Sequence, residues 1–160
     1  MKKFLMMACM MLFSTAMFAQ QGAMYLGGNL NYGLHSDYKN FGIGAKAQYE
    51  FIQNLRAEAS ADYFFKKNDV SMWDINANMH YLFRISDKFA VYPLAGLSVV
   101  GTDVDVANGS VSDSELGFNL GGGIEFPITN AVKINAEAKY RLMDDIDDHT
   151  VFSVGIAFAL

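Results

Sequence analysis

Cysteine, proline and positive charge are all scarce in this 160-residue sequence. The one cysteine, Cys9, lies in the apolar N-terminal segment, so a chain that begins near residue 20 has neither disulfide bonds nor a thiol nucleophile. The formal net charge is −5 and no stripe of Lys or Arg is present, which argues against a nucleic-acid partner. After the N-terminal segment no stretch keeps a 3.6-residue apolar period, and this favours an all-β chain.

The N-terminal segment 1–19 is predicted to be a secretion signal peptide. Lys2 and Lys3 supply the positive region, residues 4–13 the apolar core, and residues 14–19 a stretch of mostly small side chains. Cleavage is expected after Ala19, and cleavage after Ala16 is the alternative. The predicted organisation is therefore a signal peptide, 1–19, followed by one domain, 20–160.

Residues 41–65 show the clearest periodicity in the sequence. On both sides of the link 52–54, apolar side chains alternate with polar side chains or glycine. Successive side chains of a strand point to opposite faces, so this stretch predicts a β-hairpin with one apolar and one polar face. Each arm has 11 residues, about the length that a tilted strand needs to cross a bilayer.

The same alternation continues along the rest of the chain. Strands are predicted at 24–34, 41–51, 55–65, 70–83, 89–100, 116–126, 132–142 and 152–160. In the fifth of these both parities are apolar, and we favour the parity of Phe89, Val91, Ala95, Leu97 and Val99 as the apolar face. The connections at 35–40, 66–69, 101–115 and 143–149 are polar, and the others are short turns. Eight strands with short turns at one end and more polar loops at the other predict an antiparallel up-and-down transmembrane β-barrel.

Alternation alone leaves open the direction in which the apolar face points. It faces lipid in a membrane barrel, and a ligand cavity in a secreted, lipocalin-like barrel. Lipid is favoured because large aromatic side chains gather near the strand ends, as they do at membrane interfaces. The predicted interface aromatics are Tyr49, Phe51, Tyr63, Phe65, Trp73, Tyr81, Phe83, Phe126 and Tyr140. The polar parity then fills a narrow lumen with a network of Lys46, Glu50, Arg56, Glu58, Asp62, Asp74, His80, Glu125, Lys133, Glu137, Lys139 and Arg141.

Several short segments resemble those of a known family. They are Phe18-Ala19-Gln20, the runs 91–96, 121–125 and 136–141, and the alternating last strand. The mature chain resembles the small outer-membrane β-barrels of the OmpA/OmpX type, often labelled the porin family. The resemblance implies a Gram-negative outer membrane, insertion by the barrel-assembly machinery, contact with outer-membrane lipid and lipopolysaccharide, and both termini in the periplasm. Such barrels commonly end in an aromatic residue, whereas this chain ends in Leu160, with Phe158 two residues before it.

Candidate chemistry is sparse, and no catalytic, cofactor or metal site is predicted. The stretch 103–109 resembles a calcium-binding loop, but Ala107 and Asn108 stand where that loop needs an oxygen ligand and a glycine. A lipid-A-modifying enzyme would need Ser, His and a carboxylate together near the outer rim. The nearest approximation is His149 beside Asp144, Asp145, Asp147 and Asp148, with Ser153 on the inner face.

The expected function follows from this architecture. We expect a structural or interaction protein of the cell surface, with at most a narrow pore, whose acidic loops could meet an extracellular ligand that the sequence does not identify. The alternatives are a secreted barrel that binds a small apolar ligand and a lipid-A-modifying enzyme.

Overall fold

The computed structural model describes residues 22–34, 39–67, 70–106, 109–143 and 149–160. The predicted signal peptide and the four aspartates of the 143–149 connection lie outside these ranges, as do residues 35–38, with His35 among them. Within the described part of the chain, no helix is long and apolar enough to span a bilayer.

Strands make up almost all of the described chain. Their bounds are β1 (Ala23–Leu34), β2 (Lys39–Ile52), β3 (Leu55–Lys67), β4 (Val70–Tyr81), β5 (Phe83–Ser86), β6 (Phe89–Val106), β7 (Gly109–Pro127), β8 (Val132–Met143) and β9 (His149–Ala159). The segments β4 and β5 both pair with β6, so they form one barrel strand that is interrupted at Leu82. The predicted strand 70–83 is therefore broken near its end and continues to Ser86.

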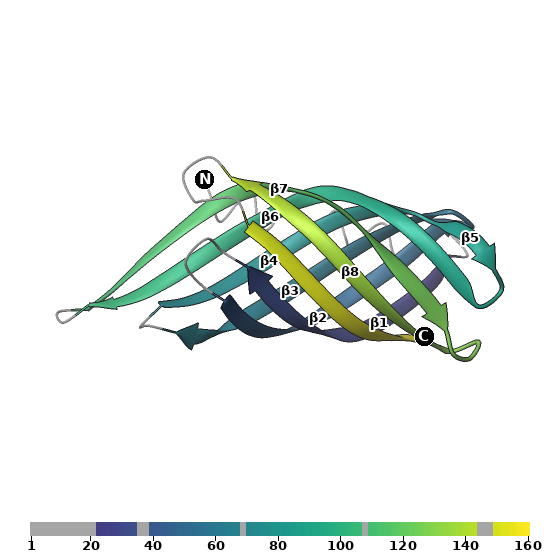
Figure 1. Ribbon diagram of the computed structural model, residues 1–160, viewed down its shortest axis with the longest axis horizontal. Coiled ribbons are helices and arrows are strands. Elements are labelled where there is room, and N and C mark those ends of the chain that lie inside the picture. Colours follow the sequence, from purple (N-terminus) through teal and green to yellow (C-terminus); the bar gives the residue numbers. More distant parts are fainter. Residues whose placement is uncertain (1–21, 35–38, 68–69, 107–108, 144–148) are drawn as a thin grey trace.

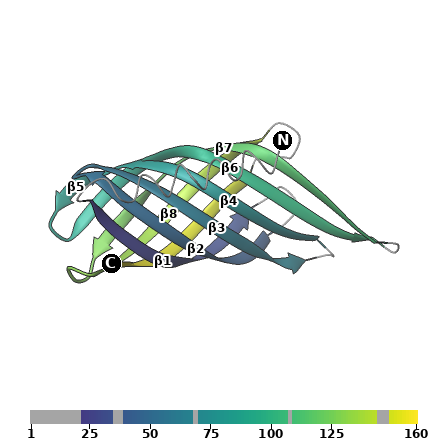
Figure 2. The ribbon, with the colours of Figure 1, turned by 180° about the vertical axis from the view of Figure 1, so that it is seen from behind.

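The strands close into a barrel in which sequence neighbours pair antiparallel. The first strand, β1, pairs with β2 on one side and with β9 on the other, and the pairing of β4 with β6 completes the ring. Figures 1 and 2 show the strands inclined to the long axis of the closed barrel. The prediction of an eight-stranded, antiparallel up-and-down barrel is confirmed.

The prediction of a long loop at 101–115 is wrong. Strand β6 runs to Val106 and β7 begins at Gly109, and the two stay in register up to the pair Val106 and Gly109. Aspartate and serine in this stretch suggested a loop, but they alternate with Val104, Val106 and Val111. A hairpin that leaves the membrane can carry polar side chains on its strands, because water satisfies them there.

The register places residues of one kind in rows around the barrel. Ala47 pairs with Ala59, Ala59 with Ala77, and Ala77 with Leu97, on the outer face. One residue along, Gln48 pairs with Glu58, and Glu58 with Asn78, on the inner face. Because a slip of one residue would exchange these rows, the apolar pattern itself specifies the register.

Candidate functional site: the polar interior

The predicted network residues line the interior of the barrel. All twelve are buried except Glu50, which is partly buried. They come from five strands, as follows: Lys46 and Glu50 from β2, Arg56, Glu58 and Asp62 from β3, Asp74 and His80 from β4, Glu125 from β7, and Lys133, Glu137, Lys139 and Arg141 from β8. We call the end with the turns at 53–54, 87–88 and 128–131 the turn end, and the opposite end the loop end.

A charged cluster occupies the turn end. The Arg56 guanidinium donates to Glu125 Oε2 over 2.6 Å, and Lys133 Nζ lies 3.5 Å from both Glu125 and Glu50. Arg84, which is exposed, reaches Glu50 at 3.2 Å from the rim. Each buried carboxylate of this cluster therefore has a cationic partner, as burial requires.

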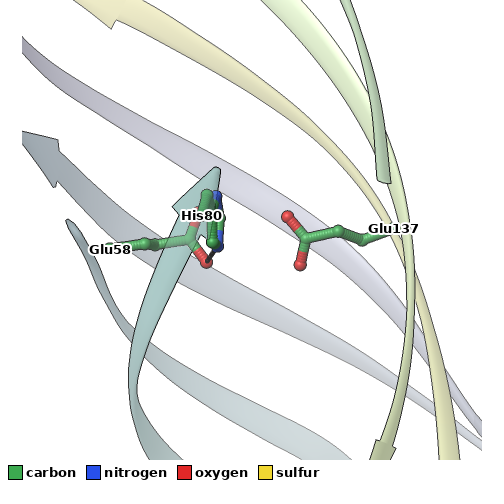
Figure 3. A group of neighbouring side chains, drawn as sticks. All are labelled: Glu58, His80 and Glu137. Atoms are coloured by element: carbon green, nitrogen blue, oxygen red, sulfur yellow. Dashed lines mark ion pairs between the residues drawn. The ribbon is translucent and has the colours of Figure 1, made fainter. Parts of the chain in front are cut away.

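A second cluster lies in the middle of the lumen. Glu58 from β3, His80 from β4 and Glu137 from β8 point toward one another across the barrel (Figure 3). The Glu58 carboxylate accepts from Gln48 Nε2 at 2.7 Å, and the Glu137 carboxylate accepts from the Tyr92 hydroxyl at 2.8 Å. His80 stacks on Tyr92 with ring centroids 4.8 Å apart.

A third cluster lies toward the loop end. Arg141 lies 2.8 Å from Asp74 Oδ2 and also donates to the side-chain oxygens of Asn76 and Asn119. Asp62, directly opposite Asp74 on the paired strand, accepts from amides and a hydroxyl. Its donors are Asn29, Asn31, Ser60 and Asn76. Neutral donors therefore surround the carboxylate of Asp62, whose cross-strand neighbour Asp74 carries the same negative charge.

Sequence reasoning missed two parts of the interior. The first is the set of amides that join the charged clusters, such as Asn135, which accepts from Lys46 Nζ at 2.6 Å and donates to Glu137. The second is an apolar group at the turn end, formed by Leu82, Ala90, Tyr92 and Leu94. Tyr92 has the same even parity as Ser98, which faces inward, so the alternation along residues 89–100 was the signal that places Tyr92 in the lumen.

The predicted interface aromatics lie on the outer surface in two sets. Near the turn end, Tyr49 contacts Phe51 and Tyr81 contacts Phe83, both with centroids 4.9 Å apart. Phe126 contacts Phe89 at the same end. Near the loop end, Tyr63 contacts Phe65. Trp73 and Tyr140 also face outward, Trp73 partly covered and Tyr140 45% exposed.

The described residues near the loop end do not bring Ser153 and His149 together as a catalytic pair. The Ser153 hydroxyl donates to Asn31 Oδ1 at 2.6 Å, and His149 Nε2 lies 3.0 Å from an Arg141 nitrogen. Because arginine is always a donor, this imidazole nitrogen accepts and is not placed to receive a proton from a serine.

The sequence of this barrel matches a family model over nearly its whole length. The outer membrane protein beta-barrel domain model covers residues 5–159. The chain belongs to this family. It is an outer-membrane β-barrel protein, as the sequence predicted, and the secreted ligand carrier is set aside.

Solved structures agree with this assignment. The N-terminal β-barrel domain of Pseudomonas aeruginosa OprF is 13% identical with a TM-score of 0.71, over 88% of this chain and all of that one. Ail of Yersinia pestis, in complex with the heparin analogue sucrose octasulfate, is 19% identical with a TM-score of 0.63, over 88% of this chain and 100% of that one. The outer membrane enzyme PagL is 12% identical with a TM-score of 0.55, over 83% of this chain and 97% of that one. Identities this low show a common fold alone. No curated protein matches the sequence.

Proposed function

We propose that this protein is a non-enzymatic outer-membrane anchor that presents the β6–β7 hairpin outside the cell as an interaction surface. The observation that carries the proposal is the length of this hairpin. Among the described residues, β8 pairs with β7 only from Gly117 onward, whereas β7 itself begins at Gly109. The hairpin therefore extends beyond the barrel wall, as Figure 1 illustrates.

The extension offers negative charge to a partner. Residues 109–116 of β7 continue the pairing with β6 beyond Gly117, where the described pairing with β8 begins. The segment 101–116 contains Asp103, Asp105, Asp113 and Glu115 and no Lys or Arg. We expect a cationic partner, in contrast to the anionic heparin analogue that was crystallised with Ail.

The same proposal includes an interior closed to all but the smallest solutes. What supports it is the bulk of the side chains that face inward at every level. Arg56 and Arg141 are fully buried in the lumen, and Phe64 and Val100 are fully buried toward the loop end. An eight-stranded barrel has an interior just wide enough for its own side chains to fill. Reconstituted protein should give no resolved conductance steps in planar bilayers.

One experiment tests both the orientation of the barrel in the membrane and the exposure of the β6–β7 hairpin on the cell surface. The start of β1 and the end of β9 pair with each other at the turn end. We place this end in the periplasm, where lipopolysaccharide is absent and the assembly machinery acts. An epitope tag inserted between Ala107 and Asn108 should react with antibody on intact cells. A tag after Asn130, in a turn at the opposite end, should react only after permeabilisation. The reverse pattern would overturn the proposed orientation.

The enzymatic alternative has one argument in its favour, the shared fold of PagL. Against it stand the separate hydrogen bonds of Ser153 and His149 described above. Mass analysis of lipid A from cells with and without the protein tests the alternative. We expect the same profile in both, and loss of an acyl chain in the presence of the protein would establish the enzyme.

A further inference from the structure

Three atoms that can bind a metal ion lie close together in the middle cluster of the lumen. A carboxylate oxygen of Glu58, a ring nitrogen of His80 and a carboxylate oxygen of Glu137 all lie within 4.8 Å of one another. Figure 3 shows the three side chains facing a common space from opposite walls of the barrel. His80 is 0% exposed, and its Nε2 has no hydrogen-bond partner; its nearest oxygen, Glu58 Oε1, is 3.8 Å away. A buried ring nitrogen without a partner is costly unless something binds it.

The surroundings hold these groups in place. Glu58 Oε2 accepts from Gln48, and Glu137 Oε2 accepts from Tyr92 and Asn135. Each carboxylate is thus held through one oxygen, which is how outer hydrogen bonds orient the ligands of a metal ion. Stacking on Tyr92, with an interplanar angle of 11°, fixes the plane of the His80 ring.

We propose that Glu58, His80 and Glu137 bind one divalent transition-metal ion of the Zn²⁺ class inside the barrel. One imidazole and two carboxylates form a donor set that such ions accept, with the fourth position left for water. The two carboxylates bring two negative charges to the ion in this low-dielectric interior, where Lys46 and Lys139 also lie close enough to act on both of them.

Binding requires two changes, both of which the structure permits. Bonds of about 2.0–2.2 Å bring ligand atoms closer together than 4.8 Å, so the glutamate side chains must close around the ion by rotation about their flexible bonds. Arg56 donates to His80 Nδ1 at 3.2 Å, which leaves the ring proton on Nε2. For Nε2 to bind the ion as a neutral imidazole, this proton must move to Nδ1, and Arg56 must give up its contact with Nδ1 while it keeps its ion pair with Glu125.

The test uses the purified, folded barrel in detergent with Co²⁺, whose visible absorption reports nitrogen and oxygen ligation. Excess Mg²⁺ in the solution occupies the oxygen-only sites of acidic surface segments. We expect one Co²⁺ per chain, displaced by Zn²⁺, and at least a roughly tenfold loss of affinity in His80→Gln and in Glu58→Gln. His149→Gln, which removes another buried lumen histidine, should bind as the native protein does.

Heat-modifiable migration identifies the folded fraction of each variant, so that unfolded protein is not counted as non-binding. The measurement on the native protein tests the main point, which is whether the folded barrel binds the ion. If folded native barrel gave no cobalt absorption, or if His80→Gln bound the ion with unchanged affinity, the proposed site would be excluded.

Discussion

Arg56 on β3 and Glu125 on β7 meet inside the barrel at 2.6 Å, although β4 and β6 separate their strands in the sheet. Arg56 also lies over the Tyr92 ring, with its guanidinium carbon 5.0 Å from the ring centroid. The pair joins opposite parts of the wall near the turn end, where Lys133 and Glu50 complete the cluster.

Removing one partner of this pair should destabilise the barrel strongly. Glu125→Gln leaves the buried Arg56 guanidinium with the 3.7 Å contact to Glu50 as its remaining ion pair among the described residues, and breaking a buried pair costs about 3–5 kcal/mol. Urea titration of the barrel in detergent micelles measures the change in unfolding free energy. Arg84→Gln is the matched control, because Arg84 is exposed and its pair with Glu50 should contribute less than about 1 kcal/mol. Equal losses in the two variants would count against a low-dielectric lumen.

The two faces of one strand pair should respond differently to a lysine. Ala59 faces outward at the middle of β3, and Ala59→Lys places a cation at mid-depth in the membrane, at a cost of about 2–4 kcal/mol. Gln48 faces inward and lies 2.7 Å from Glu58, so Gln48→Lys gains an anionic neighbour. The fraction of protein assembled in the outer membrane should fall for Ala59→Lys and stay near the native level for Gln48→Lys. Equal impairment would show that the faces are assigned wrongly.

Two adjacent glycines should differ in their tolerance of alanine. A Cβ at Gly27 would overlap the Ile156 carbonyl oxygen and the Ala157 backbone, which cannot move without disturbing the β1–β9 pairing. We expect Gly27→Ala to cost about 1–3 kcal/mol. A Cβ at Gly28 meets nothing closer than the Gly44 carbonyl oxygen at 3.4 Å, so Gly28→Ala should be nearly neutral. Urea titration of both variants makes the comparison, and similar losses would contradict this register of β1 against β9.

The alternation of apolar and polar side chains along each strand made most of the fold predictable from the sequence. The hairpin of β2 and β3 was predicted because alternation depends only on the local period of a strand, and that period survives in any barrel. The interruption at Leu82 was not predictable, since it arises where its amide donates to the Asn54 carbonyl of a distant turn, at 2.7 Å.

The sequence predicted which residues line the interior, but not which of them contact one another. Parity placed Arg56 and Glu125 on the same inner face, but the contact between them depends on barrel curvature and on side-chain length. The grouping of Glu58, His80 and Glu137 likewise joins β3 and β4 to β8, which sequence distance gives no means to foresee. The prediction of a loop at 101–115 is wrong because its aspartates and serines are typical of a loop, although valines alternate with them as in a strand.

The central claim is that the apolar parity of every strand faces lipid. Trp73 is the one tryptophan of the chain and lies on that parity, paired across the strands with Gly101, where a side chain would collide with the indole. Its fluorescence in reconstituted bilayers therefore reports the environment of the outer face without any substitution. We predict strong quenching by lipids with brominated acyl chains and weak quenching by iodide in the aqueous phase. Strong quenching by iodide without quenching by the brominated chains would contradict the account.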